Sequence, residues 1–241
     1  MNLSDIARVL NVPCTLDYVL SGISIDSRKV KAGNLFVALR GEHFDGHDYI
    51  ADAARSGAVV VICEQLHAEA GVEQLVVNSS LEALAAIATW YRQEFTCPII
   101  AVTGSNGKTS VKEMIAHILP QPSLGTAGNL NNHIGVPLSI FQLQPEHRYA
   151  VFELGASHIG EIAYTVAMIQ PQVALINNIA PAHIEGFGSI EGVAQAKGEI
   201  YQGLSTGGIA VVNDDDAYAH FWDETITSHP VIRFSQLHAA D

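Results

Sequence analysis

A short glycine-rich segment, TGSNGKT at residues 103–109, carries the residue types that bind phosphate groups. Glycines allow several backbone N–H groups to converge on an anion, and a helix that starts directly afterwards adds about half a positive charge. In such a loop Lys108 would reach the β- and γ-phosphates of a nucleotide, and the Thr109 hydroxyl would ligate Mg²⁺. The segment departs from the G-x-x-x-x-G-K-[ST] pattern, because Val102 stands where the first glycine is expected. The competing interpretation is a tight strand-to-helix turn with an incidental lysine.

The residues on either side of this loop predict the strand and the helix that would position it. Residues 99–102 are apolar and mostly β-branched, which is typical of a buried parallel strand. Residues 110–118 have the spacing of an amphipathic helix. Its predicted apolar face contains Val111, Met114, Ile115 and Ile118. Strand, loop and helix in this order favour a phosphate-binding site over an incidental turn.

Two side chains that could hold a metal ion follow predicted strands of the same region. Glu153 ends the predicted strand 149–152, and His183 lies shortly after the strand 173–176. Because the carboxyl ends of parallel strands meet at one edge of a sheet, both would lie near the glycine loop and could hold Mg²⁺ beside phosphates. Taken alone, a glutamate or histidine at a strand end is more often a capping or surface residue.

An amide-rich segment and a helical lysine complete the candidates in this part of the chain. Residues 127–137 contain Asn131 and Asn132, whose neutral donors and acceptors suit a polar or anionic ligand. The same segment could equally be a long turn held by asparagine side chains. Lys197 lies in the predicted helix 190–204, where a solvated lysine is the ordinary expectation.

The first 80 residues predict a separate small α/β unit with candidate ligand positions in two loops. Short apolar strands alternate with short helices in this region, and the domain boundary is predicted near residue 80. Ser27 and Arg28 follow one strand, and the polar loop 40–48, which includes His47, follows another. Loops at the ends of buried strands bind ligands in α/β proteins. From the residues alone, a solvated turn and a surface histidine are the better interpretations.

The composition describes a globular protein with an ample core and argues against several classes. Of 241 residues, 48% are hydrophobic and 15% charged, and 25 acidic against 12 basic side chains give a formal charge of −13. Such a charge repels nucleic acid. Cys14, Cys63 and Cys97 lack metal-ligand spacing, which predicts buried thiols in a reducing compartment. No signal peptide or membrane-spanning run is visible, so we expect a cytoplasmic protein.

Five segments of the second region together resemble the motifs of the Mur ligase family. They are TGSNGKTSVKEM (103–114), GNLNNHIGVP (128–137), ELGASHIGEI (153–162), NNIAPAHIEGFGS (177–189) and AKGEI (196–200). Residues 24–50, SIDSRKVKAGNLFVALRGEHFDGHDYI, are similar to the uridine-binding region of the family. The resemblance covers nearly the whole chain in order and spacing, and the five motifs together are far more specific than any one of them.

The resemblance implies an α/β fold with a small N-terminal uridine-binding domain, residues 1–80, and a P-loop central domain with a mainly parallel sheet, residues 81–241. Members of the family have a further C-terminal domain, so the chain is expected to be an N-terminal fragment, incomplete in its central domain and inactive alone. The implied reaction is ATP-dependent addition of D-alanyl-D-alanine to UDP-N-acetylmuramoyl-tripeptide through an acyl phosphate, in peptidoglycan biosynthesis, by a monomer that binds no nucleic acid. The alternatives are a sister ligase that adds the third peptide residue, and a nucleotide-binding fragment without catalysis.

The resemblance also implies roles for individual residues. ATP binding is implied for Gly104, Ser105, Asn106, Gly107, Lys108, Thr109 and Ser110. Ligation of Mg²⁺ is implied for Thr109, Glu153, His183 and a carboxylated Lys197. Catalysis is implied for Lys108, Glu153, His183 and Lys197. Substrate binding is implied for Ser27, Arg28, Asp45, Gly46 and His47 on the uridine side, and for Asn131 and Asn132 on the path to the muramoyl-peptide.

Overall fold

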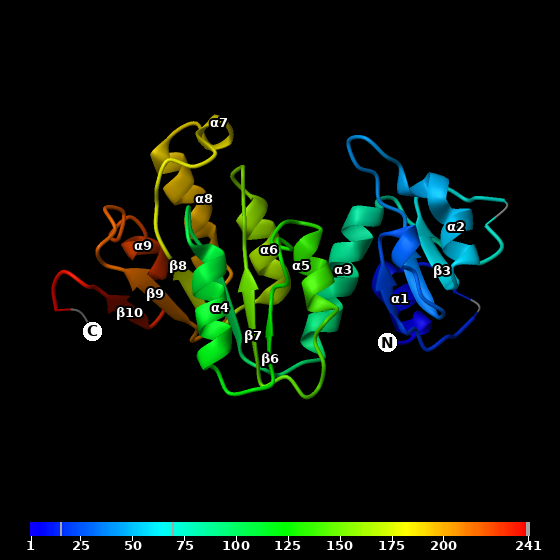
Figure 1. The fold of residues 1–241 in the computed structure, drawn as a ribbon, viewed down its shortest axis with the longest axis horizontal. Coiled ribbons are helices and arrows are strands. Elements are labelled where there is room, and N and C mark those ends of the chain that lie inside the picture. The colour runs from blue at the N-terminus through cyan, green and yellow to red at the C-terminus, as the bar shows by residue number, and fades with distance from the viewer. Residues whose placement is uncertain (15, 69, 240–241) are drawn as a thin grey trace. The chain divides into compact units, whose positions relative to one another are not determined.

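The structure, a computed structural model, describes residues 1–14, 16–68 and 70–239, and its chain forms two compact units, Met1–Tyr91 and Arg92–Asp241. Each unit contains one parallel sheet with helices (Figure 1). The sequence predicted an α/β unit for the first region and a mainly parallel sheet for the second. The predicted boundary lay near residue 80, whereas the division falls inside helix α3 (Ser80–Gln93). The sequence shows that this segment is helical, but it does not show against which unit the helix packs.

The sheet of the first unit has four parallel strands in the order β1-β2-β3-β4. The strands are β1 (Gly22–Ser24), β2 (Asn34–Val37), β3 (Ala58–Cys63) and β4 (Glu73–Val76). The helices are α1 (Leu3–Leu10) and α2 (Ile50–Arg55), with 3₁₀ turns η1 (Ser27–Lys29) and η2 (Gly46–Tyr49). Phe36 and Val61 of the sheet pack with Ile50 and Ala53 of α2 in one buried cluster. The apolar runs predicted as strands are therefore the core of this unit.

The sheet of the second unit has six parallel strands in the order β10-β9-β8-β5-β7-β6. The strands are β5 (Ile99–Thr103), β6 (Ser123–Gly125), β7 (Tyr149–Glu153), β8 (Val173–Ile176), β9 (Ile209–Asn213) and β10 (Val231–Phe234). The helices are α4 (Lys108–Ile118), α5 (Gly135–Ile140), α6 (Glu161–Ile169), α7 (Ile184–Phe187), α8 (Ile190–Gln202) and α9 (Asp223–Ile226). The chain passes from β5 to one side of the sheet first and later to the other. In open α/β sheets, ligands bind beyond the carboxyl ends of the strands at such a reversal.

The central strand β5 is buried on both faces because helices cover each side of the sheet. Ile100 and Val102 face α4 and pack with Val111 and Ile115. Helices α6 and α8 lie on the opposite face, as the ribbon shows (Figure 1). This layering fixes the carboxyl end of β5, from which the glycine loop emerges.

The buried face of α4 differs from the predicted one. Val111 and Ile115 pack against the sheet as expected, but Met114 is 66% and Ile118 79% exposed. Lys112 is instead buried, at 1% exposure, and its Nζ donates to the carbonyl of Thr126 at 2.7 Å. The helix is therefore turned so that the side of Lys112 faces inward, which apolar spacing alone did not indicate.

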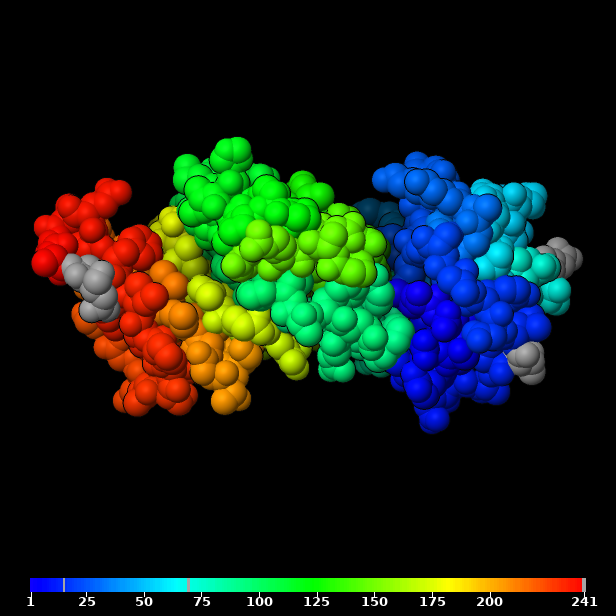
Figure 2. Space-filling model, turned by 90° about the horizontal axis from the view of Figure 1, so that it is seen from below, coloured from blue at the N-terminus to red at the C-terminus, as the bar shows by residue number. Residues whose placement is uncertain are grey.

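The remaining predictions about the chain concern its cysteines and its hydropathy. Cys63 and Cys97 are buried free thiols, as predicted, whereas Cys14 is partly exposed and donates to a neighbouring backbone carbonyl. Across residues 1–14, 16–68 and 70–239, no helix has both the length and the apolar character needed to cross a bilayer. In Figure 2 the exposed atoms of residues 203–239, orange to red, lie beside one another on the surface.

Candidate functional site

The glycine loop joins β5 to α4 at the centre of the second sheet. Helix α4 begins at Lys108, so Lys108 and Thr109 both belong to its first turn, where backbone N–H groups have no intrahelical partner. Gly107, directly before the helix, has a φ of +72°, a left-handed conformation that favours glycine. The Lys108 ammonium donates to the carbonyl of Gly104 at 2.9 Å. The predicted loop thus has the backbone geometry and the positive charge that phosphate binding needs.

Glu153 ends β7 beside the loop, and the structure brings it to Thr109 as the sequence predicted. The Thr109 hydroxyl donates to Glu153 Oε2 at 2.8 Å. Asn131 donates its side-chain amide to Glu153 Oε1, also at 2.8 Å. The backbone N–H of Glu153 donates to the Thr126 hydroxyl at 3.0 Å. Each oxygen of this buried carboxylate therefore has a neutral donor, and the direct contact of Asn131 is a role that the sequence did not indicate.

Lys197 and His183 both contact Phe187 but differ in burial. Lys197, on α8, is 2% exposed, and its Nζ lies 5.8 Å from the centre of the Phe187 ring. Burial, and secondarily the charge of Lys108, lowers the pKa of Lys197 to about 8. His183 is exposed, has a φ of +51° and packs edge-on against Phe187 at 6.5 Å. The expectation of a solvated helical lysine is therefore wrong, because α8 packs this side chain into the core.

The residues at the mouth of the loop fit a magnesium ion in their chemistry. Glu153 is 2% exposed, and among the described residues no lysine or arginine forms an ion pair with it. A buried carboxylate without a cation is costly, and Mg²⁺ prefers oxygen ligands such as Glu153 and the Thr109 hydroxyl. Within the same described ranges, no three His, Cys, Asp or Glu side chains cluster as a metal site. Glu153 and His183 thus do not form a larger acidic or histidine cluster.

A cavity of about 330 Å³ lies beside the loop and contains several of the predicted positions. It is lined by Lys108, Asn131, Asn132, His133, Gly155, Ala156, Ser157, Glu161 and His183. Asn132 also accepts through its Oδ1 from the N–H groups of Ile134 and Gly135, at the start of α5. The amide-rich segment therefore combines both interpretations: it lines a cavity, and its asparagines hold a turn.

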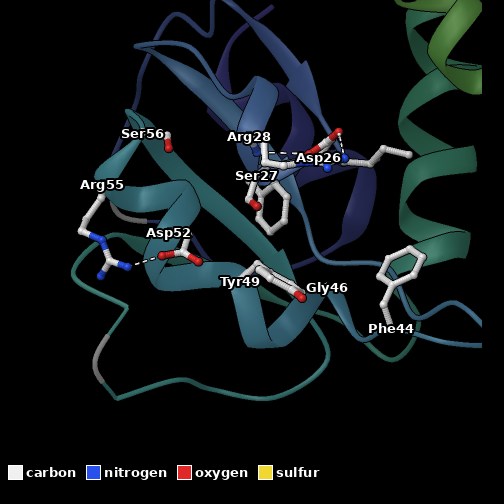
Figure 3. Close-up of a pocket in the computed structure, with 11 residues that line it drawn as sticks. Asp26, Ser27, Arg28, Phe44, Gly46, Tyr49, Asp52, Arg55 and Ser56 are labelled. Carbon is white, nitrogen blue, oxygen red and sulfur yellow. Dashed lines mark hydrogen bonds and ion pairs between the residues drawn. The ribbon is translucent and has the colours of Figure 1, made fainter.

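A larger cavity, of about 760 Å³, lies in the first unit (Figure 3). It is lined by Ile25, Asp26, Ser27, Arg28, Phe36, Phe44, Gly46, Tyr49, Asp52, Arg55 and Ser56. Ser27, Arg28 and Gly46 were predicted substrate-binding residues, and they do line it. Arg28 donates from Nε and Nη2 to both carboxylate oxygens of Asp26, at 2.8 and 2.9 Å. This contact lowers the pKa of Asp26 to about 2.

The other two predicted residues of this loop, Asp45 and His47, do not line the cavity. His47 is 6% exposed, and its Nδ1 lies 2.5 Å from Asp45 Oδ1. Its Nε2 accepts from the backbone N–H of Glu64 at 3.0 Å, and its ring stacks on His67. His47 is therefore not a surface histidine; it links the loop to the residue that directly follows β3.

Several cavity residues of the first unit escaped the sequence reasoning. Tyr49, Asp52 and Arg55 recur every three residues through η2 and α2, which puts them on one helical side. Phe44 is 59% exposed at the cavity rim. The sequence signal for these residues is the three-residue spacing of polar and aromatic side chains directly after a polar loop. The helix is too short for its exposed face to be predicted from that spacing.

The parallel sheet, the glycine loop after its central strand and the threonine–glutamate contact define a P-loop type of α/β protein. Comparison with known families makes the assignment specific. Residues 102–241 match the Mur ligase middle domain, and residues 19–92 match the family described as Mur ligase family, catalytic domain. The chain belongs to the Mur ligase family.

Individual relatives and solved structures agree with this assignment. UDP-N-acetylmuramoyl-tripeptide--D-alanyl-D-alanine ligase of Escherichia coli K12 is 48% identical over 98% of this chain and 52% of its own length. A crystal structure of MurF from Acinetobacter baumannii has a TM-score of 0.89 and 38% identity, covering 96% of this chain and 52% of that one. MurF ligase from Thermotoga maritima, solved in complex with ADP, gives 0.82 and 33%, covering 90% and 51%. The chain spans about half the length of the curated relatives it matches.

Proposed function

We propose that the protein is an ATP-dependent, amide-forming ligase that joins D-alanyl-D-alanine to UDP-N-acetylmuramoyl-tripeptide in peptidoglycan biosynthesis. The observation that carries the proposal is the Thr109–Glu153 contact at the mouth of the glycine loop. The Escherichia coli relative that is 48% identical is a UDP-N-acetylmuramoyl-tripeptide--D-alanyl-D-alanine ligase, which supports the choice of substrates. Membership of a ligase family favours catalysis over passive nucleotide binding.

The reaction must bring two anions together, the terminal carboxylate of the tripeptide and the γ-phosphate of ATP. Lys108 and the N–H groups of the first turn of α4 reduce their repulsion. The carboxylate oxygen attacks the γ-phosphorus, the bond to the bridging oxygen breaks, and ADP and an acyl phosphate result. The amine then attacks the acyl carbon, phosphate leaves, and the amine proton passes to solvent. Mg²⁺, held by Thr109 and Glu153 and on the second site by Glu153, His183 and modified Lys197, would neutralise phosphate charge.

We propose further that Lys197 is carboxylated on Nζ by CO₂ in the active enzyme. The side chain is 2% exposed, and among the described residues no carboxylate pairs with it. Glu199, a conceivable partner, instead accepts from the N–H groups of Gly160 and Ala163. The neutral amine attacks the carbon of CO₂, an N–C bond forms, one C=O π bond opens to a carboxylate oxygen, and one proton is released. The resulting carbamate reverses the charge of a buried cation and offers oxygen atoms to Mg²⁺.

The cavity of the first unit is the proposed site for the uridine end of the substrate. Ser27, Arg28 and Gly46 line it, and Tyr49 offers an aromatic ring for stacking on the base. Asn131 and Asn132 line the cavity beside the glycine loop, on the proposed path to the peptide. The free thiols fit a reducing compartment, and we propose that the protein acts in the cytoplasm as a monomer.

The test is the reaction itself, carried out with the full-length product of the gene. With ATP, Mg²⁺, UDP-N-acetylmuramoyl-tripeptide and D-alanyl-D-alanine, we expect equal amounts of ADP, phosphate and UDP-linked pentapeptide. A parallel reaction offers the UDP-linked dipeptide with a diamino acid or lysine, which are the substrates of the sister activity. Product in the second reaction only would replace the proposed substrate pair, and no ATP-dependent product in either would refute the ligase proposal.

A further inference from the structure

The segment that follows β8, residues 177–180, is joined to the glycine loop by hydrogen bonds. The reaction proposed above assigns these hydrogen bonds no role. We call this segment the strap. It contains Asn177, Asn178, Ile179 and Ala180, and it leaves the carboxyl end of β8 directly beside β5. His183 follows three residues later in the chain. The strap is therefore placed to hold the loop from the side opposite to Glu153.

The side chain of Asn178 pairs with both backbone polar groups of Asn106, its N–H and its carbonyl. Its Oδ1 accepts from the N–H of Asn106 at 2.9 Å, and its Nδ2 donates to the carbonyl of Asn106 at 3.0 Å. Asn177 Nδ2 donates to the same carbonyl at 2.8 Å. Because a backbone N–H can meet only an acceptor, this arrangement also fixes which atom of the Asn178 amide is the oxygen.

Ser105 is bound to the strap in the same way. Its N–H donates to the carbonyl of Asn178 at 2.9 Å. Its hydroxyl donates to the carbonyl of Ala180 and accepts from the N–H of Ala180, both at 2.9 Å. The N–H groups of Ser105 and Asn106 are thus already used within the protein, and they differ in this respect from the N–H groups that open α4.

The strap also packs tightly around two glycines of the loop. A Cβ atom on Gly104 would lie 3.0 Å from the Cβ of Asn177, and one on Gly107 would lie 3.0 Å from Asn177 Nδ2. At the other side, Asn213 Nδ2 donates to the carbonyl of Asn177 at 3.0 Å. Asp216 Oδ2 accepts from the N–H of Ile179 at 2.7 Å. The strap is therefore anchored to the end of β9 and cannot move freely with the loop.

We propose that Asn178 is a positioning residue that preorganises the glycine loop, so that phosphate is bound by the N–H groups of residues 107–110 and not by those of Ser105 and Asn106. The proposal rests on the nucleotide binding proposed above. A loop that is ordered before the ligand arrives loses less conformational entropy on binding. The N–H groups at the start of α4 lack intrahelical partners and are the ones left to meet an anion.

Amide hydrogen exchange of the unliganded protein tests the strap without any nucleotide. We expect slow exchange at the N–H groups of Ser105 and Asn106, because both are bonded to Asn178. Addition of ATP and Mg²⁺ should slow exchange at Lys108, Thr109 and Ser110 and change the first two little. Fast exchange at Asn106 in the unliganded wild type would overturn the proposal, and so would protection by ATP that appears only at residues 105 and 106.

The variant Asn178→Ala removes both side-chain bonds to Asn106 and should weaken ATP binding about tenfold. In the full-length protein the KM for ATP should rise by the same factor with kcat nearly unchanged. A merely structural role would reduce the active fraction, and hence kcat, at constant KM. Asn78→Ala, which changes an exposed asparagine of the first unit, is the control and should leave both constants unchanged.

The outcomes separate this proposal from the one on which it rests. A wild-type protein that does not bind ATP would refute the proposed function. A wild-type protein that binds ATP, with equal affinity in Asn178→Ala, would refute the strap alone. If Asn178→Ala does not fold, the exchange rate of Asn106 in the wild type still decides, because that measurement needs no variant.

Discussion

The two cavities of this protein differ in whether the basic side chains that line them are paired with carboxylates. In the first unit, both arginines at the cavity are paired with an aspartate on the same segment, Arg28 with Asp26 and Arg55 with Asp52. In the second unit, Lys108 donates to the loop carbonyls of Gly104 and Ser105 and has no other partner among the described residues. Arg28 and Arg55 are therefore neutralised within the first cavity, whereas Lys108 of the second cavity has no carboxylate partner in the part of the chain that the structure describes.

This difference predicts which part of a nucleotide substrate each cavity takes. A cavity with paired charges and the aromatic rings of Phe44 and Tyr49 suits an uncharged base and sugar. Lys108, which lies at the start of α4 and has no carboxylate partner among the described residues, suits phosphate groups. The lesson is that a count of basic residues near a pocket says little until their partners are known.

The largest effect should come from the buried lysine of the second unit. Lys197→Ala should lower kcat/KM of the full-length enzyme about 10²- to 10³-fold, since it removes the carbamate proposed to hold the Mg²⁺ that would neutralise phosphate charge. Short carboxylic acids such as acetate should restore part of the activity, because they can supply the missing carboxylate. Lys31→Ala, at an exposed lysine of the first unit, is the control. A fully active Lys197→Ala enzyme would contradict the proposed role.

The next effect in size concerns Lys108. Lys108→Ala removes a charge-assisted contact to phosphate worth about 1.5–3 kcal/mol, so ATP should bind about 10- to 100-fold more weakly. Calorimetry with ATP and with ADP measures the change, and titration with UDP serves as the control because the first unit is untouched. Equal weakening of UDP and ATP would remove the contrast between the two cavities.

A smaller effect is expected in the first unit. Tyr49→Ala should weaken binding of UDP about tenfold, because stacking of an aromatic ring on a base contributes about 1–3 kcal/mol. ATP affinity should not change. Tyr18→Ala alters a partly exposed tyrosine of the same unit that does not line the cavity, and it should bind UDP as the wild type does. If both variants bind UDP normally, the ring of Tyr49 does not contact the base.

The smallest expected effect is a pKa shift that tests whether Arg28 and Asp26 of the first cavity are paired. Arg28 holds the pKa of Asp26 at about 2, so this carboxylate should stay ionised as the pH falls from 7 until about pH 2. In Arg28→Gln the pKa should rise toward its ordinary value of about 3.9. NMR titration of the Asp26 carboxyl carbon in both proteins measures this shift. The same pKa in the two proteins would mean that the pair does not form in solution.

Much of the second unit could be predicted because its chemistry follows from strand order. The apolar run and the glycine loop with Lys108 predicted β5, the loop and α4. Thr109 and Glu153 were expected to meet because parallel strands bring their carboxyl ends to one edge, and their side chains are 2.8 Å apart. Such predictions need only local pattern and the geometry of a parallel sheet.

The features that could not be predicted depend on contacts between distant residues. Asn178 meets Asn106 across 72 positions of the chain, and no local pattern distinguishes this asparagine from a solvated one. The burial of Lys112 depends on the carbonyl of Thr126, which accepts a hydrogen bond from its Nζ. His47 was expected on the surface or against substrate, but the N–H of Glu64 and the carboxylate of Asp45 hold it inside. In each case a polar partner from another segment decides the outcome.

The central claim is that nucleotide phosphates bind at the loop of the second unit, while the cavity of the first unit takes the uridine end. Residue-resolved amide NMR during separate titrations of the 25.8 kDa chain with UDP and with ATP plus Mg²⁺ tests it directly. ATP should shift the signals of residues 107–110 and of Asn131, and UDP should shift those around Ser27 and Tyr49. A titration in which ATP shifts residues 25–56 and leaves the loop unchanged would contradict the claim.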